Sequence, residues 1–471
     1  MTKQKSSLYI FSITLVATLG GLLFGYDTAV ISGAEKSVQS YLIEGLGLSS
    51  FIHGATISSA LIGCIIGGLL SGYFSSAYGR KKSLIIAAVL FLLSALGSAY
   101  PEILFFTPGE PTIGLLIAFN IYRIIGGIGV GLASAIVPIY IGEIAPAHIR
   151  GRLVSFNQFA IIFGMLVVYF VNWGIASGQS LEWINEIGWR YMFASEAIPA
   201  LLFCIFLFFV PETPRYLALK KDDEGALSIL SKINGTAAAK SILRDIKESV
   251  NVSTEKLSVF AYGKMVIVIG ILLSVFQQFV GINVALYYAP RIFESMGAAK
   301  DASMLQTIVM GLVNVIFTVI AIMTVDKLGR KPLLIVGSIG MAIGMFGVAG
   351  LAFANIIGIS TLLFIVVYTA SFMISWGPVC WVLISEIFPN RIRGQAVAIA
   401  VAAQWAANYL VSSTYPMMME FSGGMTYGIY GIMSVLSAIF VWKFVPETKG
   451  KSLEQMEKLW QVPSAKNSKA I

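Results

Sequence analysis

Charged side chains are scarce in this chain: Asp, Glu, Lys and Arg make up only 12% of its 471 residues. A soluble globular domain carries about 25%, so much of the charge that a water-exposed surface needs is missing. Hydrophobic residues reach 57%, and they come in runs of the ~20 residues that cross the hydrocarbon core of a bilayer. The composition therefore predicts an integral membrane protein whose solvent is the lipid bilayer.

Histidine and cysteine are equally sparse, with two and three residues in the whole chain. Cys64, Cys204 and Cys380 all lie in apolar segments, so they predict neither a disulfide framework nor a metal cluster. We expect no metal and no cofactor. The net charge of +8 comes from Lys and Arg between the hydrophobic runs. It indicates membrane orientation, not a nucleic-acid-binding surface.

Twelve hydrophobic runs predict twelve transmembrane helices. No cleaved signal peptide is expected, because the run that begins at Leu8 is too long and no cleavage site follows it. The predicted spans lie near residues 9–31, 51–77, 84–101, 114–142, 153–175, 189–210, 264–296, 303–325, 332–354, 361–387, 394–418 and 426–445.

A polar segment divides the spans into two sets of six. Its residues Ile242, Leu243, Ile246 and Val250 recur at helical spacing, which predicts short amphipathic helices beneath the membrane domain. The predicted units are a six-helix bundle over 1–210, a linker over 211–262, a second six-helix bundle over 263–446 and a tail over 447–471.

Lys and Arg gather in alternate loops, for example around Arg80 and Arg330, in the linker and near both termini. The other set of loops holds few of them. By the positive-inside rule, this asymmetry predicts that both termini and the linker are cytoplasmic.

The two sets of spans carry an internal repeat. The segment YGRKK at 78–82 corresponds to LGRKP at 328–332, EIAPAHIRG at 143–151 to EIFPNRIRG at 386–394, and VPET at 210–213 to VPET at 445–448. Parallel repeats of this kind are typical of transporters that bind substrate at the midplane between two bundles.

These motifs, together with GGLLFGYDTAVISG at 20–33, FQQFVGIN at 276–283 and SWGPVCWVLISEIFP at 375–389, resemble the sugar porters of the major facilitator superfamily. The resemblance covers nearly the whole chain and is greatest to the bacterial D-xylose–proton symporters. It implies an all-α major facilitator fold that functions as a monomer in a bacterial inner membrane. It also implies uptake of a monosaccharide, most simply D-xylose, together with a proton by alternating access.

The resemblance also implies a gate of ion pairs at the cytoplasmic helix ends, which holds the outward-open state and breaks as the inside opens. The alternative is charge that only sets topology or forms static surface pairs, each contributing about 0–1 kcal/mol. The gate residues are Arg80, Glu143, Arg150, Glu212, Arg330, Glu386, Arg393 and Glu447.

Amides within the spans are candidates for the sugar site, because Asn and Gln both donate and accept hydrogen bonds without charge. An aromatic plane covers the apolar face of a sugar. The alternative for each amide is a hydrogen bond between helices, which we expect for Asn408. The candidates, most of them supported by the resemblance, are Phe24, Gln158, Met165, Gln277, Gln278, Asn283, Tyr287, Asn314, Trp381 and Gln404.

Two helix interruptions support this placement, since broken helices at membrane depth line cavities. Gly281 is expected to break the seventh span, and Gly377-Pro378 the tenth. Met165 departs from the resembled symporters, which have Gln at this place on the helix. Because Met cannot donate a hydrogen bond, a hexose stays open as an alternative to xylose.

Asp27, Arg123 and Glu196 are ionisable residues within the first-half spans. Such residues are costly in a membrane and by default functional. The resemblance implies that Asp27 takes the proton, that Arg123 is its partner and that Glu196 assists. Passive facilitators of the family have Asn at the position of Asp27. Three alternatives remain: a facilitator with a structural Asp27–Arg123 pair, a membrane sugar sensor, and an integral-membrane enzyme, for which no catalytic motif is found.

Overall fold

The computed structural model describes residues 3–103, 105–107, 109–146, 149–251, 258–295, 299–356, 358–389, 392–449 and 460. Within these residues, twelve helical runs are long and apolar enough to span a membrane, which confirms the predicted number. The spans are Leu8–Leu46, Ser59–Ala77, Arg80–Ala99, Ile113–Ile144, Leu153–Ala176, Leu181–Phe209, Lys264–Tyr287, Lys300–Val325, Arg330–Phe353, Ile359–Ile384, Arg393–Phe421 and Gly423–Phe444.

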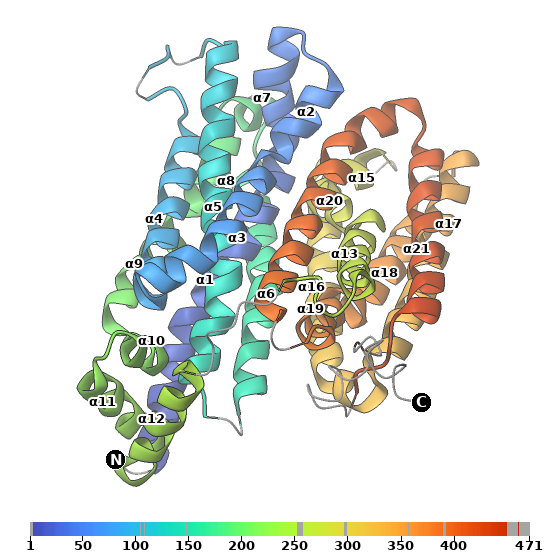
Figure 1. The fold of residues 1–471 in the computed structure, drawn as a ribbon. Helices are drawn as coiled ribbons and strands as arrows, with labels where there is room; N and C mark the ends of the chain where they lie inside the picture. Colours follow the sequence, from blue (N-terminus) through green and yellow to red (C-terminus); the bar gives the residue numbers. More distant parts are fainter. Residues whose placement is uncertain are drawn as a thin grey trace, which may run out of the picture.

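Two groups of helices stand side by side (Figure 1). The first half contains α1 (Lys3–Val38), α2 (Ser50–Ile57), α3 (Ser59–Ala77), α4 (Arg80–Ala99), α5 (Ile113–Ile144), α6 (Arg150–Ala176), α7 (Leu181–Trp183), α8 (Trp189–Ser195) and α9 (Ala197–Phe209). It also holds the short segments η1 (Gln39–Ile43), η2 (Glu44–Leu46) and η3 (Ile184–Gly188).

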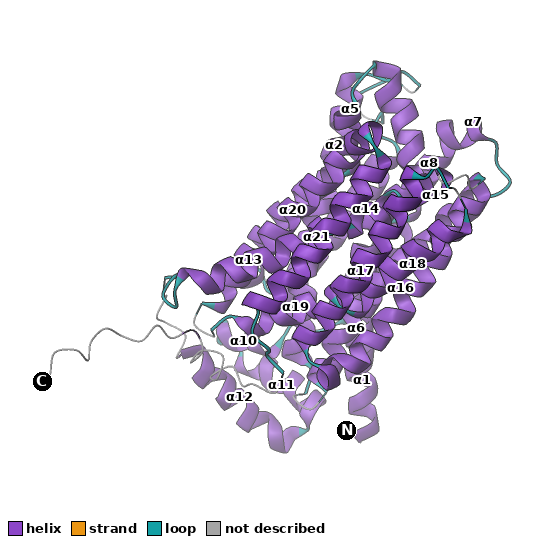
Figure 2. Cartoon of the chain, turned by 90° about the vertical axis from the view of Figure 1, so that its right-hand side faces the viewer, coloured by secondary structure: helices purple, strands orange, loops and turns teal. Residues whose placement is uncertain are grey.

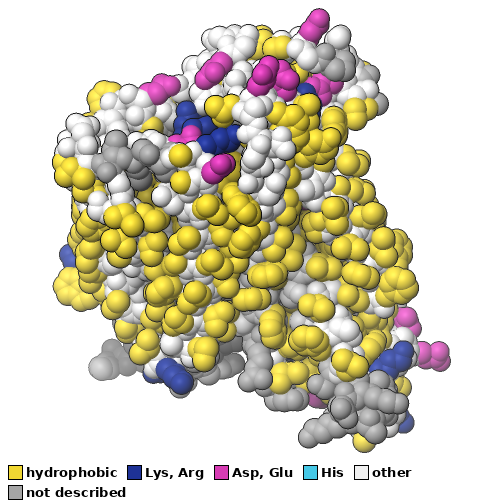
Figure 3. Space-filling model, turned by 180° about the vertical axis from the view of Figure 1, so that it is seen from behind, with side chains coloured by type: hydrophobic (Ala, Val, Ile, Leu, Met, Phe, Trp, Pro, Cys, Tyr) yellow, Lys and Arg dark blue, Asp and Glu magenta, His cyan; other side chains and the backbone are white. Residues whose placement is uncertain are grey.

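The second half begins after the linker. It contains α13 (Lys264–Phe279), α14 (Ile282–Tyr287), α15 (Ala289–Ser295), α16 (Lys300–Leu328), α17 (Arg330–Phe353), α18 (Ile359–Ile374), α19 (Trp376–Ile387), α20 (Arg393–Phe421) and α21 (Gly423–Phe444). Helices and loops account for all the described residues in Figure 2. The space-filling view shows hydrophobic side chains around the middle and charged ones toward the two ends (Figure 3), as a bilayer requires.

The linker folds as α10 (Pro214–Leu219), α11 (Asp223–Asn234) and α12 (Thr236–Asn251). These helices lie at the same end of the molecule as the N-terminus (Figure 1). We call this end the linker face and the opposite end, where η1 and α15 lie, the distal face. The apolar residues of the linker helices pack on one another, with Leu230 of α11 against Leu243 of α12. The side chain of Val250 lies outside the described residues.

Glycine allows close helix packing within the first half. A Cβ atom on Gly63 would lie 2.0 Å from the carbonyl oxygen of Ile124, and one on Gly127 would lie 1.8 Å from that of Ala60. Both distances are far below van der Waals contact, so only glycine permits this approach of α3 and α5. Between the halves, α6 packs on α16, α2 and α3 pack on α20, and α1 touches α14 and α15.

Three spans are broken near the centre. Gly281 interrupts the seventh span with a φ of +90°, which confirms that prediction. The tenth span breaks at Ser375, so the prediction of a break at Gly377-Pro378 is wrong by two residues. Proline is tolerated in the first turn of a helix, so Pro378 sits just inside α19. A third break, at Glu196 between α8 and α9, was not predicted, although Pro199 marks the first turn of α9.

Candidate functional site

The three ionisable residues of the first half meet at the centre of the bundle. Arg123 Nη1 of α5 donates to Asp27 Oδ1 of α1 over 2.8 Å, and Arg123 Nη2 donates to the backbone oxygen of Asp27 over 3.2 Å. Asp27 and Glu196 are fully buried and Arg123 is 1% exposed. A pair buried this deeply is strongly coupled, since removing either charge leaves the other uncompensated.

Glu196 belongs to the same charge cluster, because its carboxyl interacts electrostatically with both Asp27 and Arg123. Neither of its oxygens reaches hydrogen-bond geometry with a described residue. Arg123 also lies over the ring of Phe193, 5.4 Å from its centroid. One cation therefore serves two carboxyl groups, and it bonds only one of them. The two carboxyl groups therefore share a single guanidinium as their cation.

Amides of the second half form a continuous chain of hydrogen bonds. Gln404 Nε2 of α20 donates to Gln277 Oε1 of α13, Gln278 Nε2 donates to the same oxygen over 3.3 Å, and Asn283 Nδ2 donates to Gln278 Oε1. Gln277 Nε2 donates in turn to the backbone oxygen of Trp376 over 2.9 Å. The break at Gly281 places Asn283 back against Gln278, so the chain closes across the helix interruption.

Several buried polar atoms of the second half have no hydrogen-bond partner among the described residues. They include Gln404 Oε1, Asn314 Oδ1 and the indole Nε1 of Trp405. Leaving a buried polar atom unpaired costs about 1–3 kcal/mol. A ligand rich in hydroxyl groups satisfies such donors and acceptors together.

Trp405 was missed by the sequence reasoning. It is 5% exposed, and its ring centroid lies 5.7 Å from that of Phe24 of α1, so the two aromatic residues meet across the halves. The sequence signal that could have identified it is a tryptophan, whose indole donates a hydrogen bond, directly after Gln404 in a transmembrane span. Phe24 thereby joins the charge cluster, three residues before Asp27, to the amide chain.

The remaining predicted residues differ in burial and in contacts. Asn408 Nδ2 donates to the Tyr287 hydroxyl over 3.4 Å. Gln158 and Trp381 are half-buried. Met165 is 7% exposed and packs in the apolar core, where α6 comes so close to α1 that a Cβ on Gly25 would lie 3.1 Å from the Met165 nitrogen. Met165 thus presents packing surface, not a polar group.

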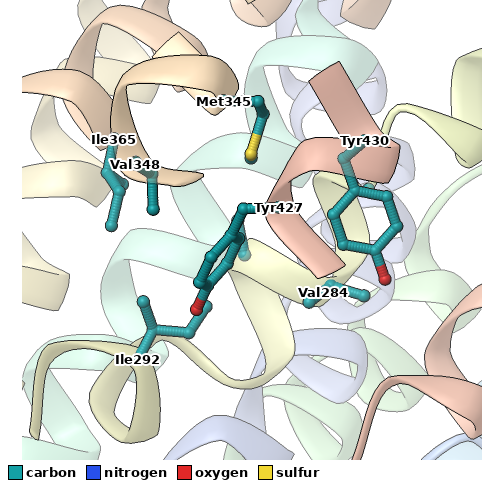
Figure 4. A pocket seen from close by; sticks show the side chains of 9 residues that line it. Val284, Ile292, Met345, Val348, Ile365, Tyr427 and Tyr430 are labelled. Carbon is teal, nitrogen blue, oxygen red and sulfur yellow. The ribbon is translucent and has the colours of Figure 1, made fainter. Parts of the chain in front are cut away.

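A small cavity of about 10 Å³ lies behind the break at Gly281. Figure 4 shows Tyr427 and Tyr430 reaching over it, with Val284 and Ile292 beside their hydroxyl groups. Its volume is that of about one water molecule. It is therefore a packing gap at the helix break and not a sugar site.

At the linker face of the first half, polar contacts join α4, α5 and the segment after α9. Arg80 Nη2 donates to Glu143 Oε1 over 2.8 Å, and Thr213 Oγ1 donates to Glu143 Oε2 over 2.6 Å. Glu212 accepts the backbone N–H groups of Arg80 and Lys81 at the start of α4, over 3.1 and 3.0 Å. A carboxylate at a helix N-terminus is favourable. Gly79 is required beside it, because its φ is +89° and a Cβ there would lie 2.3 Å from Glu212 Oε2.

The second half repeats this arrangement at the start of α17. Arg330 Nη2 donates to Glu386 Oε1 over 2.9 Å, and Thr448 Oγ1 donates to Glu386 Oε2 over 2.6 Å. Glu447 accepts the backbone N–H groups of Arg330 and Lys331. The Arg80–Glu143 pair therefore lies within the first half and the Arg330–Glu386 pair within the second, and neither pair connects the two halves.

Glu212 and Glu447, which accept the first backbone N–H groups of α4 and α17, differ in the direction of their pKa shifts. Burial raises the pKa of Glu212, against three backbone N–H donors and Arg80, which lower it. Burial acts the same way on Glu447, but four backbone N–H donors, led by that of Lys449, lower its pKa overall.

The other two predicted gate residues are placed differently. Arg393 Nη2 donates to the backbone oxygen of Phe388 over 3.4 Å. Arg150 is exposed at the start of α6, and no ion pair joins it to another described residue.

The chain matches the family model of sugar (and other) transporters over residues 13–460. It belongs to that family. Among its members, the D-xylose–proton symporter of Escherichia coli (strain K12) is 57% identical to this sugar transporter, and the alignment covers 99% of both chains.

Solved structures agree with this membership. The E. coli xylose transporter XylE in an inward-open conformation is 56% identical, with a TM-score of 0.87 over 96% of this chain and 100% of that one. The proton:xylose symporter XylE bound to 6-bromo-6-deoxy-D-glucose is 56% identical, with a TM-score of 0.82 over 97% and 100% of the two chains. The fold is therefore that of the major facilitator superfamily, as predicted.

Proposed function

We propose that this protein takes up D-xylose together with a proton across the cytoplasmic membrane of a bacterium. The observation that carries the proposal is the buried Asp27–Arg123 pair with Glu196 beside it. The 57% identity to a D-xylose–proton symporter supports the same function.

Proton binding and conformation are linked through Arg123. With Asp27 ionised, Arg123 holds α5 to α1, because a charge-assisted hydrogen bond in a buried site is strong. A proton on Asp27 removes the negative charge from this pair, and Arg123 becomes free to turn toward Glu196. The two arrangements differ in how α1 is held. Since α1 contacts both its own bundle and α14 and α15 of the other half, a proton on Asp27 changes the cost of moving the halves.

The sugar binds at the centre between the halves, mainly to the amide chain of the second half. Gln277, Gln278, Asn283 and Gln404 offer donors and acceptors to its hydroxyl groups, and Phe24 and Trp405 cover its apolar face. The other predicted contacts are Gln158, Met165, Tyr287, Asn314 and Trp381. Closure of the halves over the sugar then couples its binding to the state of Asp27.

Orientation follows from the charges at the two ends. We place the linker face in the cytoplasm, since Lys and Arg gather there and the positive-inside rule applies. Contacts across the halves close the distal face, where Lys36 pairs with Glu294 and Arg291 pairs with Glu35. With this orientation, we assign the conformation to a state that is closed toward the outside. In the outward-open state, the Arg–Glu clusters of the linker face are expected to form pairs across the halves, with Arg150 and Arg393 completing them. The unit of transport is the monomer.

The proposal is tested in proteoliposomes with an imposed pH gradient and membrane potential. A proton that crosses about 100 mV supplies roughly 2.3 kcal/mol, and one pH unit adds about 1.4 kcal/mol. One proton per sugar therefore supports a few hundredfold accumulation of labelled xylose, at about 1.4 kcal/mol per decade. Accumulation that persists unchanged with a protonophore would exclude proton coupling. Equilibration without accumulation would indicate a passive facilitator.

A hexose–proton symporter is the second candidate, because Met165 supplies an apolar contact in the sugar site. Methionine is flexible and adapts to a ligand's apolar edge, such as the extra carbon of a hexose. A panel of labelled sugars in the same assay decides between the two.

A further inference from the structure

Two ion pairs connect the halves at the distal face, and both involve adjacent residues of α1. Glu35 accepts from Arg291 Nη1, and Lys36 Nζ donates to Glu294 Oε2. Arg291 and Glu294 lie three residues apart on α15, so they share one face of that helix. The opposite charges of the two neighbouring residues on each helix are thus matched across the halves.

Glu35 also has a titratable partner from its own half. His53 Nε2 of α2 lies 3.1 Å from Glu35 Oε1, the oxygen that Arg291 binds. Glu35 and His53 are each 1% exposed. Histidine is the side chain that ordinarily changes charge between pH 5 and 8. The buried carboxylate therefore stands between an arginine of one half and a titratable residue of the other.

The surroundings of His53 contain few other charges. Tyr288, between α14 and α15, meets the imidazole edge to face at 6.4 Å, and the ring of Tyr415 of α20 lies tilted against that of Tyr288, with the centroids 4.7 Å apart. Glu420 of α20 accepts from Ser50. The segment η1 contributes Gln39, which donates to Glu44 of η2 over 2.9 Å, and α1 contributes Lys36 beyond Glu35.

A cavity of about 200 Å³ lies at this junction, lined by residues of both halves that include His53, Arg291, Tyr415 and Glu420. Its volume has room for several water molecules, and because His53 lines it, water in the cavity would reach the imidazole.

We propose that Glu35, His53 and Arg291 form a proton-operated latch that holds the distal face closed until His53 is protonated. The inference rests on the proposed function, since it requires that the halves separate at this face.

When the halves part, Arg291 leaves with α15, whereas His53 stays beside Glu35. A neutral imidazole then leaves a buried carboxylate without a cation, which is costly. An imidazolium takes the place of the departing guanidinium. In the closed state the same imidazolium stands next to Arg291, and the two like charges repel. Both effects have the same sign: a proton on His53 favours opening.

The latch is separate from the coupling site. Glu35 follows Asp27 by eight residues on α1, about 12 Å along the helix. The proton on His53 selects the outward-open state when the outside is acidic, and it need not cross with the sugar. The latch therefore sets the pH dependence of the conformational equilibrium, whereas Asp27 sets how far sugar accumulates.

The test measures distal opening in the full-length chain carrying Asp27→Asn, so that the coupling proton makes no contribution. The native cysteines are replaced, and spin labels at Gln179→Cys and Phe421→Cys, both exposed at the distal face, report the distance between the halves in nanodiscs. From pH 8 to pH 5.5 the ratio of long to short distances should rise about fivefold or more, the lower end of coupling between two sites.

His53→Gln should abolish this rise and keep the face closed, and His53→Arg should keep it open at every pH. Arg291→Gln should open the face already at pH 8, which supplies an independent test if the His53 variants do not fold. Binding of xylose verifies the fold of each variant. No pH response with His53 present, an equal response in His53→Gln, or a closed face in Arg291→Gln would overturn the latch. Failure of proton-driven accumulation in the wild type would instead overturn the proposed function.

Discussion

The two halves share a fold but divide the chemistry of the central site. The first half holds the buried charges, with Asp27 bonded to Arg123 over 2.8 Å. The second half holds the neutral amides, linked from Gln404 through Gln277 and Gln278 to Asn283. Under the proposed function, the duplicated scaffold provides a proton-binding half and a sugar-binding half. Coupling between them must cross the interface where Phe24 meets Trp405.

The largest expected effect comes from removing the charge of the first half. Asp27→Asn keeps the shape of the side chain and mimics a permanently protonated acid, so the proton gradient no longer acts on the cycle. Accumulation of xylose should fall from a few hundredfold to none, while sugar binding stays largely intact. Accumulation in proteoliposomes and binding to purified protein are measured together. An equal loss of both would mean that Asp27 is only a structural partner of Arg123.

Removing an amide from the second half should have the opposite effect: sugar binding weakens while proton coupling is kept. Gln277→Ala deprives Gln404 and Gln278 of their shared acceptor, and unpaired buried groups cost about 1–3 kcal/mol. Xylose affinity should fall about five- to hundredfold, with accumulation still sensitive to a protonophore. The matched control is Asn172→Ala, a buried amide of the first half that donates to the backbone of Val30 over 3.2 Å. If that control weakens binding equally, the division between the halves is wrong.

Met165 tests whether the first half also contributes to sugar recognition. In Met165→Gln the new amide can bond a sugar hydroxyl, a net gain of about 0.5–1.5 kcal/mol for one hydrogen bond. We expect xylose binding to improve relative to glucose binding, when both are measured side by side. An unchanged ratio would remove Met165 from specificity and leave recognition to the amides alone.

The smallest effect concerns the repeated carboxylates of the linker face. Glu447, whose pKa is lowered, contributes stability that is present at neutral pH and lost as the pH falls through that pKa. Glu212, whose pKa burial raises, costs stability when ionised, and this cost disappears on acidification. Glu447→Gln should therefore lower the free energy of unfolding at pH 7, whereas Glu212→Gln should not lower it. The decrease should be at most about 1 kcal/mol, because both groups are partly exposed. Thermal unfolding of both variants at pH 7 and pH 5 checks the sign, and equal behaviour would contradict the difference.

Much of the site could be anticipated from residue type alone. Asp27, Arg123 and Glu196 stand out because ionisable residues are rare in spans, and Gln277, Gln278 and Gln404 because amides are. Trp405 was not distinguished from other aromatic residues of the spans, since only its contact with Phe24 of the other half shows its place. The break at Glu196 was missed because the apolar run continues through it, and the break before Pro378 was placed two residues late.

The sequence by itself determined the number of spans, their division into two repeats and the linker between them. This follows because every segment in lipid must satisfy its own backbone hydrogen bonds, so each apolar run forms a helix independently of the others. The tertiary structure alone decided which faces meet. Asp27 and Arg123 are 96 residues apart, and Glu35 and Arg291 are 256 apart. Such pairings depend on how side chains of distant helices pack, which hydropathy does not encode.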